Sequence, residues 1–158
     1  MAPGTNTAAE LLHVSLRAPC PYLRALLLAA APLLAWAQPP LPAADARAVR
    51  EVIEAQLDAF LKDDAPRAFS YATAGIRETF RTPENFLQMV RTSYPAVYRP
   101  KAVKFEPPEL IGDELVQPVR LTDADGRAWL ALYPMQREPG GTWRIIGCQL
   151  ARLAGQEA

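Results

Sequence analysis

The stretch from Glu114 to Arg137, ELVQPVRLTDADGRAWLALYPMQR, decides the fold of this chain. On either side of its centre the residue pattern has a period of two, as in β-strands. The centre, residues 123–126 (Asp-Ala-Asp-Gly), is typical of a tight turn, because Asp and Gly adopt the backbone angles that turns require. A connection this short joins antiparallel neighbours, so we expect a hairpin with strands over 114–122 and 127–137. Pro118 and Pro134 cannot donate to a sheet ladder and should mark bulges or edge positions.

Two further strands are expected on either side of this hairpin, near residues 101–107 and 142–152. Turn residues separate them from the hairpin at Ile111-Gly112-Asp113 and Pro139-Gly140-Gly141. The sequence therefore predicts a four-stranded antiparallel meander.

Helical patterns precede these strands. The first has the i, i+3, i+4, i+7 spacing of an amphipathic helix at Val49, Val52, Ile53, Gln56 and Phe60, and it ends at Lys62-Asp63-Asp64. A short second helix is expected from Pro66 to Ala72, with Gly75 ending it, and a third from Thr82-Pro83-Glu84 to Pro95. Three helices followed by four strands predict an α+β fold, with the helices packed on one face of the sheet.

Residues 1–37 have the layout of a secretory signal peptide. Arg24 precedes an apolar run, and Ala35-Trp36-Ala37 fits cleavage after Ala37. The run has about half of the roughly 20 residues that cross a bilayer, so we expect no stable membrane span after removal of the leader. A buried N-terminal helix is the alternative interpretation. The expected organisation is a signal peptide (1–37), a flexible tether (38–44), a single domain (45–152) and a C-terminal tail (153–158), in a protein that is periplasmic or secreted.

Cleavage after Ala37 would remove the only histidine, His13, and one of the two cysteines, Cys20. Most familiar catalytic and metal-binding schemes are then excluded, and we expect neither a cofactor nor a metal. The remaining cysteine, Cys148, lies in an apolar run and should be a buried, inert thiol. The mature segment has 15 basic and 16 acidic side chains, so it lacks the positive charge of a nucleic-acid-binding protein.

Several segments resemble one family of exported bacterial proteins. They are LTDADGRAWLALY at 121–133, GTWRIIGC at 141–148, IEAQLDAF at 53–60, PENFLQMV at 83–90 and YPAVY at 94–98. The family is named domain of unknown function 4864, and the resemblance covers roughly residues 45–152. It implies a fold like that of nuclear transport factor 2, in which a curved sheet wraps around helices to form a cone. It implies no activity and no catalytic residues.

Gln56 is the most informative polar residue, because it falls in the middle of an apolar helical stripe. A buried amide must find hydrogen-bond partners. One interpretation ties the amide to backbone groups of the sheet. The other places Gln56 at the floor of a cone-shaped cavity, where it presents its amide to a ligand.

The strand over 127–137 is apolar on both faces. Trp129, Ala131, Tyr133 and Met135 share one face, and Ala128, Leu130 and Leu132 share the other. Helices can cover one face, and the second then needs a second subunit or a bound partner. We therefore expect a homodimer through the back of the sheet, unless the sheet curls enough to bury both faces.

Residues 123–126 also match the opening of a calcium loop, but the glutamate expected near the twelfth position is missing, so a hairpin turn is the preferred interpretation. No carboxylate clearly projects inward, and Asp58 should face solvent. Arg120 could bind an anionic group if its strand face is internal, and it is otherwise a surface arginine.

Together these patterns predict a small exported binding module, homodimeric and without catalysis of its own, whose pocket takes a small apolar ligand. The candidate ligand-binding residues are Gln56, Tyr94, Tyr98, Arg120, Trp129 and Tyr133. Two alternatives remain open. One is an isomerase- or lyase-type enzyme with a tyrosine as acid and a carboxylate as base. The other is a structural protein whose sheet face docks another protein.

Overall fold

The computed structural model describes residues 41–112 and 114–157, which belong to one compact unit spanning residues 38–158. The predicted signal peptide, with His13 and Cys20, lies outside the described residues, as do residues 38–40 of the predicted tether. None of the helices in the described part is long and apolar enough to span a bilayer.

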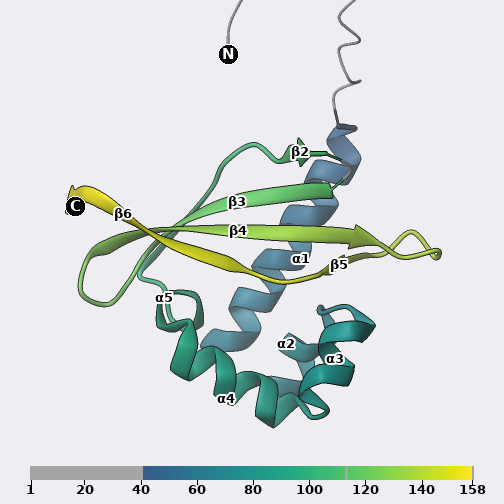
Figure 1. Cartoon of the computed structure of the whole chain (residues 1–158), viewed down its shortest axis with the longest axis horizontal. Coiled ribbons are helices and arrows are strands. Elements are labelled where there is room, and N and C mark those ends of the chain that lie inside the picture. Colours follow the sequence, from purple (N-terminus) through teal and green to yellow (C-terminus); the bar gives the residue numbers. More distant parts are fainter. Residues whose placement is uncertain (1–40, 113, 158) are drawn as a thin grey trace, which may run out of the picture. The chain divides into compact units, whose positions relative to one another are not determined.

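Within the described residues, five helices precede six strands, which confirms the α+β prediction (Figure 1). The helices are α1 (Ala43–Leu61), α2 (Ala65–Ser70), α3 (Ala74–Phe80), α4 (Pro83–Ser93) and α5 (Pro95–Tyr98). Four of the five residues in the predicted stripe of α1 are buried, and the fifth, Val52, is partly buried. The helix begins two residues inside the stretch expected to be tether. The Thr82 hydroxyl accepts a hydrogen bond from the Asn85 N–H at 3.2 Å, so the predicted start of α4 is correct.

Two helices were not predicted. Gly75 was expected to end α2, yet it is the second residue of α3. Glycine makes a helix less stable by roughly 0.5–1 kcal/mol relative to alanine, which is too little to prevent one that packs against its neighbours. Pro95 does end α4, but it also opens α5, since proline fits the first position of a helix.

One antiparallel sheet contains all the described strands: β1 (Ala102–Phe105), β2 (Glu109–Ile111), β3 (Glu114–Thr122), β4 (Arg127–Arg137), β5 (Trp143–Ile145) and β6 (Gln149–Glu157). The central hairpin of β3 and β4 has the predicted bounds, with Leu115 opposite Met135 and Thr122 opposite Ala128. Both β1 and β2 pair with the free edge of β3, and both β5 and β6 pair with that of β4. The predicted meander is therefore present. The strand expected near 101–107 is β1, and β2 is an additional strand beyond it; the strand expected near 142–152 is divided into β5 and β6, and β6 continues into the expected tail.

The two prolines lie beside the breaks in the pairing of the outer strands. The Pro118 carbonyl accepts a hydrogen bond from the Glu106 N–H at 3.1 Å, between β1 and β2. The Pro134 carbonyl accepts one from the Ile146 N–H at 2.9 Å, between β5 and β6. Neither proline can return the second bond of an antiparallel pair, so regular pairing stops there. The pairing of β3 with β4 continues through both prolines without a bulge. Each proline instead lies where the opposite edge of its strand is not regularly paired, which is an edge position over that short stretch.

The helices cover one face of the sheet. Leu115, Val119, Ala131, Tyr133 and Met135 point to that side and belong to the hydrophobic core. In Figure 1 the strands lie in front of α1 and present their opposite face to the viewer. The apolar residues that β3 and β4 place on this outer face are Val116, Pro118, Ala128, Leu130, Leu132 and Pro134. Val116 and Pro118 are buried, and no described helix covers the face (Figure 1).

Candidate functional site

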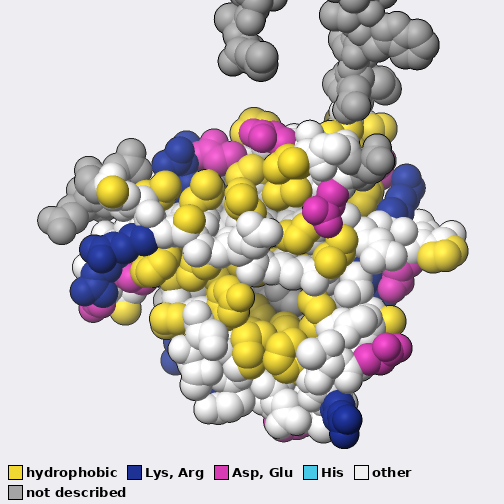
Figure 2. Space-filling view, viewed as in Figure 1, with side chains coloured by type: hydrophobic (Ala, Val, Ile, Leu, Met, Phe, Trp, Pro, Cys, Tyr) yellow, Lys and Arg dark blue, Asp and Glu magenta, His cyan; other side chains and the backbone are white. Residues whose placement is uncertain are grey.

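A cavity of about 300 Å³ lies between the helices and the sheet. Its walls are mainly the apolar side chains of Phe60, Ala72, Ile76, Phe80, Phe86, Met89, Val90, Val97, Ile145 and Ile146. Figure 2 shows hydrophobic side chains around a hollow below the strands. The volume is at the lower end of the range of small-molecule sites.

Phe86 organises the helical wall of the cavity. Its ring lies 6.0 Å from that of Phe60 in α1, 5.4 Å from Phe69 in α2 and 5.6 Å from Phe80 in α3, measured between centroids. Tilted and edge-on ring pairs of this kind add to the stabilisation from burial. One side chain of α4 thus brings three other helices together around the cavity.

Gln56 reaches the cavity from α1 and is 3 % exposed. Its Nε2 donates to the backbone carbonyl of Ala68 at 3.1 Å, at the buried side of α2. The structure thus combines the two interpretations of this residue. The amide has a backbone partner, in a helix and not in the sheet, and the side chain also lines the cavity.

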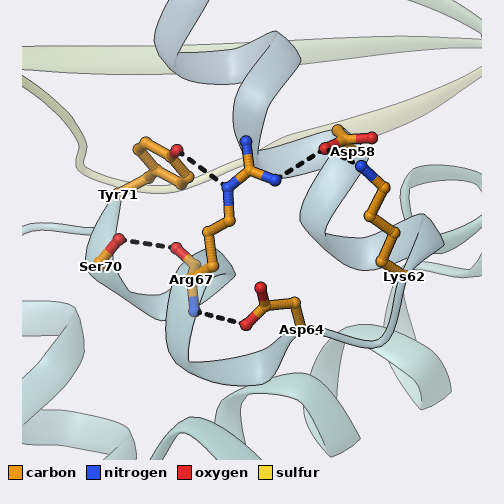
Figure 3. Close-up of polar contacts among 6 residues, drawn as sticks. All are labelled: Asp58, Lys62, Asp64, Arg67, Ser70 and Tyr71. Atoms are coloured by element: carbon orange, nitrogen blue, oxygen red, sulfur yellow. Dashed lines mark hydrogen bonds and ion pairs between the residues drawn. The ribbon is translucent and has the colours of Figure 1, made fainter.

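A network of exposed residues holds α2 in position (Figure 3). Arg67 donates to the Asp58 carboxylate at 2.8 Å and to the Tyr71 hydroxyl at 3.4 Å. Lys62 also donates to Asp58, at 2.9 Å, and these hydrogen bonds lower the pKa of the Asp58 carboxyl. Because Asp58 is on α1, the network fixes α2 against α1 close to the Gln56 contact. Asp58 faces solvent, as predicted.

Tyr133 is the most buried polar side chain of the cavity wall. It is 1 % exposed, and its hydroxyl has no hydrogen-bond partner within the described residues. Burial, followed by the neighbouring Cys148, raises the pKa of the Tyr133 phenol well above its ordinary value. A buried hydroxyl without a partner costs on the order of 1–3 kcal/mol, so its retention here needs an explanation.

Cys148 lines the cavity from the segment between β5 and β6. Although the residue as a whole is only partly buried, its apolar surroundings raise the pKa of the thiol to about 12, while the neighbouring Tyr133 hydroxyl, which is not within hydrogen-bonding geometry of the thiol, acts in the opposite direction. The thiol is therefore protonated at neutral pH. A protonated thiol is a poor nucleophile.

Three of the six candidate residues come together in this cavity: Gln56, Tyr94 and Tyr133. The other three lie elsewhere. Tyr98 donates to the Asp63 carboxylate, and its ring lies beneath the guanidinium groups of Arg91 and Arg99 at 5.3 and 5.0 Å.

The remaining two candidates belong to the sheet. Arg120 lies on the exposed side of β3 and forms an ion pair with Glu106 at 2.8 Å. Trp129 donates its indole N–H to the Asp123 carboxylate at 2.8 Å, and this bond lowers the pKa of that carboxyl.

The turn at 123–126 is a hairpin connection, as its residues predict. One oxygen of Asp123 accepts from the N–H groups of Asp125 and Arg127, both at 2.9 Å, and Gly126 has a φ of +82°. Within the described residues, no three histidine, cysteine or acidic side chains are grouped as metal ligands would be.

Sequence reasoning missed the wall that α3 provides. Ile76 and Phe80 are spaced i, i+4 on that helix, and this spacing was the available signal. It also treated Cys148 only as a buried thiol, although the segment that carries it forms one side of the cavity.

One family model matches residues 42–158, and its description is Domain of unknown function (DUF4864). No curated protein and no solved structure matches the chain.

Proposed function

Because the chain belongs to the DUF4864 family, whose description names no activity, we propose a function from its cavity: the protein is a binding module for a small, largely apolar ligand. The observation that carries this proposal is the cavity of about 300 Å³, with apolar walls and the unpartnered hydroxyl of Tyr133. Natural binding pockets have this composition, in which a few polar groups in an apolar wall orient the ligand.

The volume sets the size of the ligand. An apolar cavity of roughly 150 Å³ holds one benzene molecule, so a cavity of twice that volume suits a compound of about two rings. Binding would be driven mainly by removal of apolar surface from water.

The ionisable groups of the cavity favour binding over catalysis. General acid–base chemistry works best with a pKa near the operating pH, and the pKa values of Tyr133 and Cys148 are both displaced upward. An isomerase or lyase would also need a carboxylate beside the tyrosine. The described residues that line this cavity include no aspartate or glutamate.

The proposal includes export and self-association. The layout of residues 1–37 supports secretion to the periplasm or beyond. On the outer face Val116 is already buried within one chain, whereas Leu130 and Leu132 remain partly exposed, and these two leucines favour a homodimer in which the two sheets meet.

A fluorescent probe tests ligand binding. N-phenyl-1-naphthylamine is uncharged and apolar, and it has one ring more than the expected ligand. Its emission should rise when the naphthyl group enters the cavity and the phenyl group lies at the entrance. Ile146, at the rim and 36 % exposed, can be replaced by tryptophan to block the entrance, and Ile111→Trp, on β2 and 57 % exposed, is the matched control. We expect Ile146→Trp to weaken binding at least about tenfold, which is about 1.4 kcal/mol, and Ile111→Trp to leave it unchanged. Equal binding by all three proteins, or none by the unaltered chain, would contradict the proposal.

A further inference from the structure

The hydroxyl of Tyr133 is held in place by the sheet. Tyr133 lies at the centre of β4, opposite Gln117 of β3, and both side chains point to the helical side. Gln117 does not satisfy the hydroxyl: its amide nitrogen donates to the carbonyls of Glu106 at 2.6 Å and Pro118 at 2.8 Å, and its amide oxygen forms no hydrogen bond with Tyr133. The tyrosine therefore reaches the cavity wall with its hydrogen-bonding capacity unused.

The cavity offers a ligand no charged partner. Of its described lining residues, none is a lysine, arginine, aspartate or glutamate. An ion placed there would lose its hydration without gaining a counter-charge, which is strongly unfavourable. The ligand must therefore be uncharged.

The neutral phenol is a donor as well as an acceptor. Since Tyr133 keeps its proton, the hydroxyl hydrogen is available to a ligand, and an oxygen acceptor is the group that matches it. Such a contact would remove the cost of the unsatisfied hydroxyl and would distinguish an oxygen-containing ligand from a hydrocarbon of the same shape.

We propose that the cavity selects an uncharged, compact, mostly apolar compound with one oxygen acceptor, and that Tyr133 is the residue that recognises this oxygen. This inference rests on the proposed binding function and assigns its ligand class. Gln56, whose amide is already bonded to Ala68, shapes the cavity floor and is not the discriminating group.

Isochroman and tetralin test this assignment, because the two bicyclic compounds differ only by an oxygen in place of one methylene group. Their affinities can be measured by displacement of N-phenyl-1-naphthylamine from the full chain. We expect isochroman to bind more tightly than tetralin to the unaltered protein. In Tyr133→Phe we expect the affinity for isochroman to fall about tenfold and the affinity for tetralin to stay unchanged. The dissociation constant of tetralin divided by that of isochroman should therefore fall about tenfold.

Tyr94→Phe is the matched control, since it removes a second hydroxyl from the same cavity wall. This variant should keep the preference for isochroman. If both compounds bind but Tyr133→Phe keeps the full preference, or if Tyr94→Phe loses it, the assignment to Tyr133 is wrong and the binding function stands. If neither compound nor the probe binds the unaltered chain, the binding function itself fails.

Discussion

Gln117 donates its side-chain amide to the backbone carbonyl of Glu106 at 2.6 Å, in the place where an ordinary sheet would use the N–H of residue 118. That residue is proline, and its own carbonyl accepts from the Glu106 N–H. The amide therefore supplies the bond that the backbone cannot, at the division between β1 and β2. This explains why a glutamine is buried at the core face of a central strand.

Replacement of Gln117 should be costly for this reason. We expect Gln117→Met to lower the free energy of unfolding by about 1–3 kcal/mol, because the Glu106 carbonyl loses its donor. Urea denaturation measures the change. Pro118→Ala restores a backbone N–H, so the double variant should lose less than the sum of the two single variants. If the effects of Gln117→Met and Pro118→Ala on the free energy of unfolding simply add in the double variant, the Gln117 amide does not replace the missing N–H of Pro118.

Tyr133→Phe should have the opposite effect on stability. In the absence of ligand it removes a buried hydroxyl without a partner, so we expect the free energy of unfolding to rise by about 1 kcal/mol. The measurement is the denaturation midpoint of the ligand-free protein. A decrease of similar size would mean that the hydroxyl has a stabilising partner in the folded chain.

Cys148 should make stability depend on pH in the alkaline range. Its folded pKa is about 12 against an ordinary value of 9.0, so the unfolded chain loses the thiol proton first. Below pH 9 both states are protonated and the full stability is present. As the pH rises from about 9 to 12, the free energy of unfolding falls because the unfolded chain releases the thiol proton and the folded chain keeps it. The fall is at most about 1.4 kcal/mol per pH unit.

Comparison of the unaltered chain with Cys148→Ala isolates this effect from that of Tyr133, whose raised pKa acts in the same direction. The variant should show a shallower fall in stability above pH 9. In the unaltered chain, iodoacetamide should modify Cys148 far more slowly than a free thiol at pH 8, as measured by peptide mass. Rapid modification of the folded protein at that pH would rule out the protonated, desolvated thiol.

The outer face predicts the oligomeric state. We expect sedimentation to show a dimer, and Leu132→Arg to weaken its association at least about tenfold by placing a charge in the apolar interface. Leu61→Arg is the control, because Leu61 is an exposed leucine at the end of α1, away from the outer face that carries the partly buried Leu132. A monomer at high concentration, or equal association of both variants, would show that the outer face does not mediate a dimer.

The sequence was sufficient to predict the central hairpin, because the period-two pattern of two neighbouring segments and the turn residues between them both indicate antiparallel strands. Asp123 and Gly126 define the turn, and the strands on both sides have the bounds that the pattern predicts. The breaks in the pairing of the outer strands could not be located in advance. They depend on which edge of β3 and β4 the carbonyls of Pro118 and Pro134 face, and only the paired structure determines this.

The candidate site was predicted in part for a similar reason. Helical spacing was enough to place Gln56 in the interior, and strand alternation was enough to place Tyr133 on the core face of its strand. Trp129 has the alternation of Tyr133 but lies near the turn, where Asp123 binds its indole N–H. The absence of a partner for the Tyr133 hydroxyl depends on neighbours from distant segments, so no local pattern reveals it.

Methyl NMR tests the central claim, that the cavity is a ligand site, most directly. Titration of the protein with N-phenyl-1-naphthylamine should produce saturable shifts at the methyl groups of Ile76, Met89 and Ile146, which line the cavity. The methyl groups of Ile111 on β2 should not move. Shifts at Leu130 and Leu132 instead would place the probe on the outer face, and that result, or no saturable shift at all, would contradict the account.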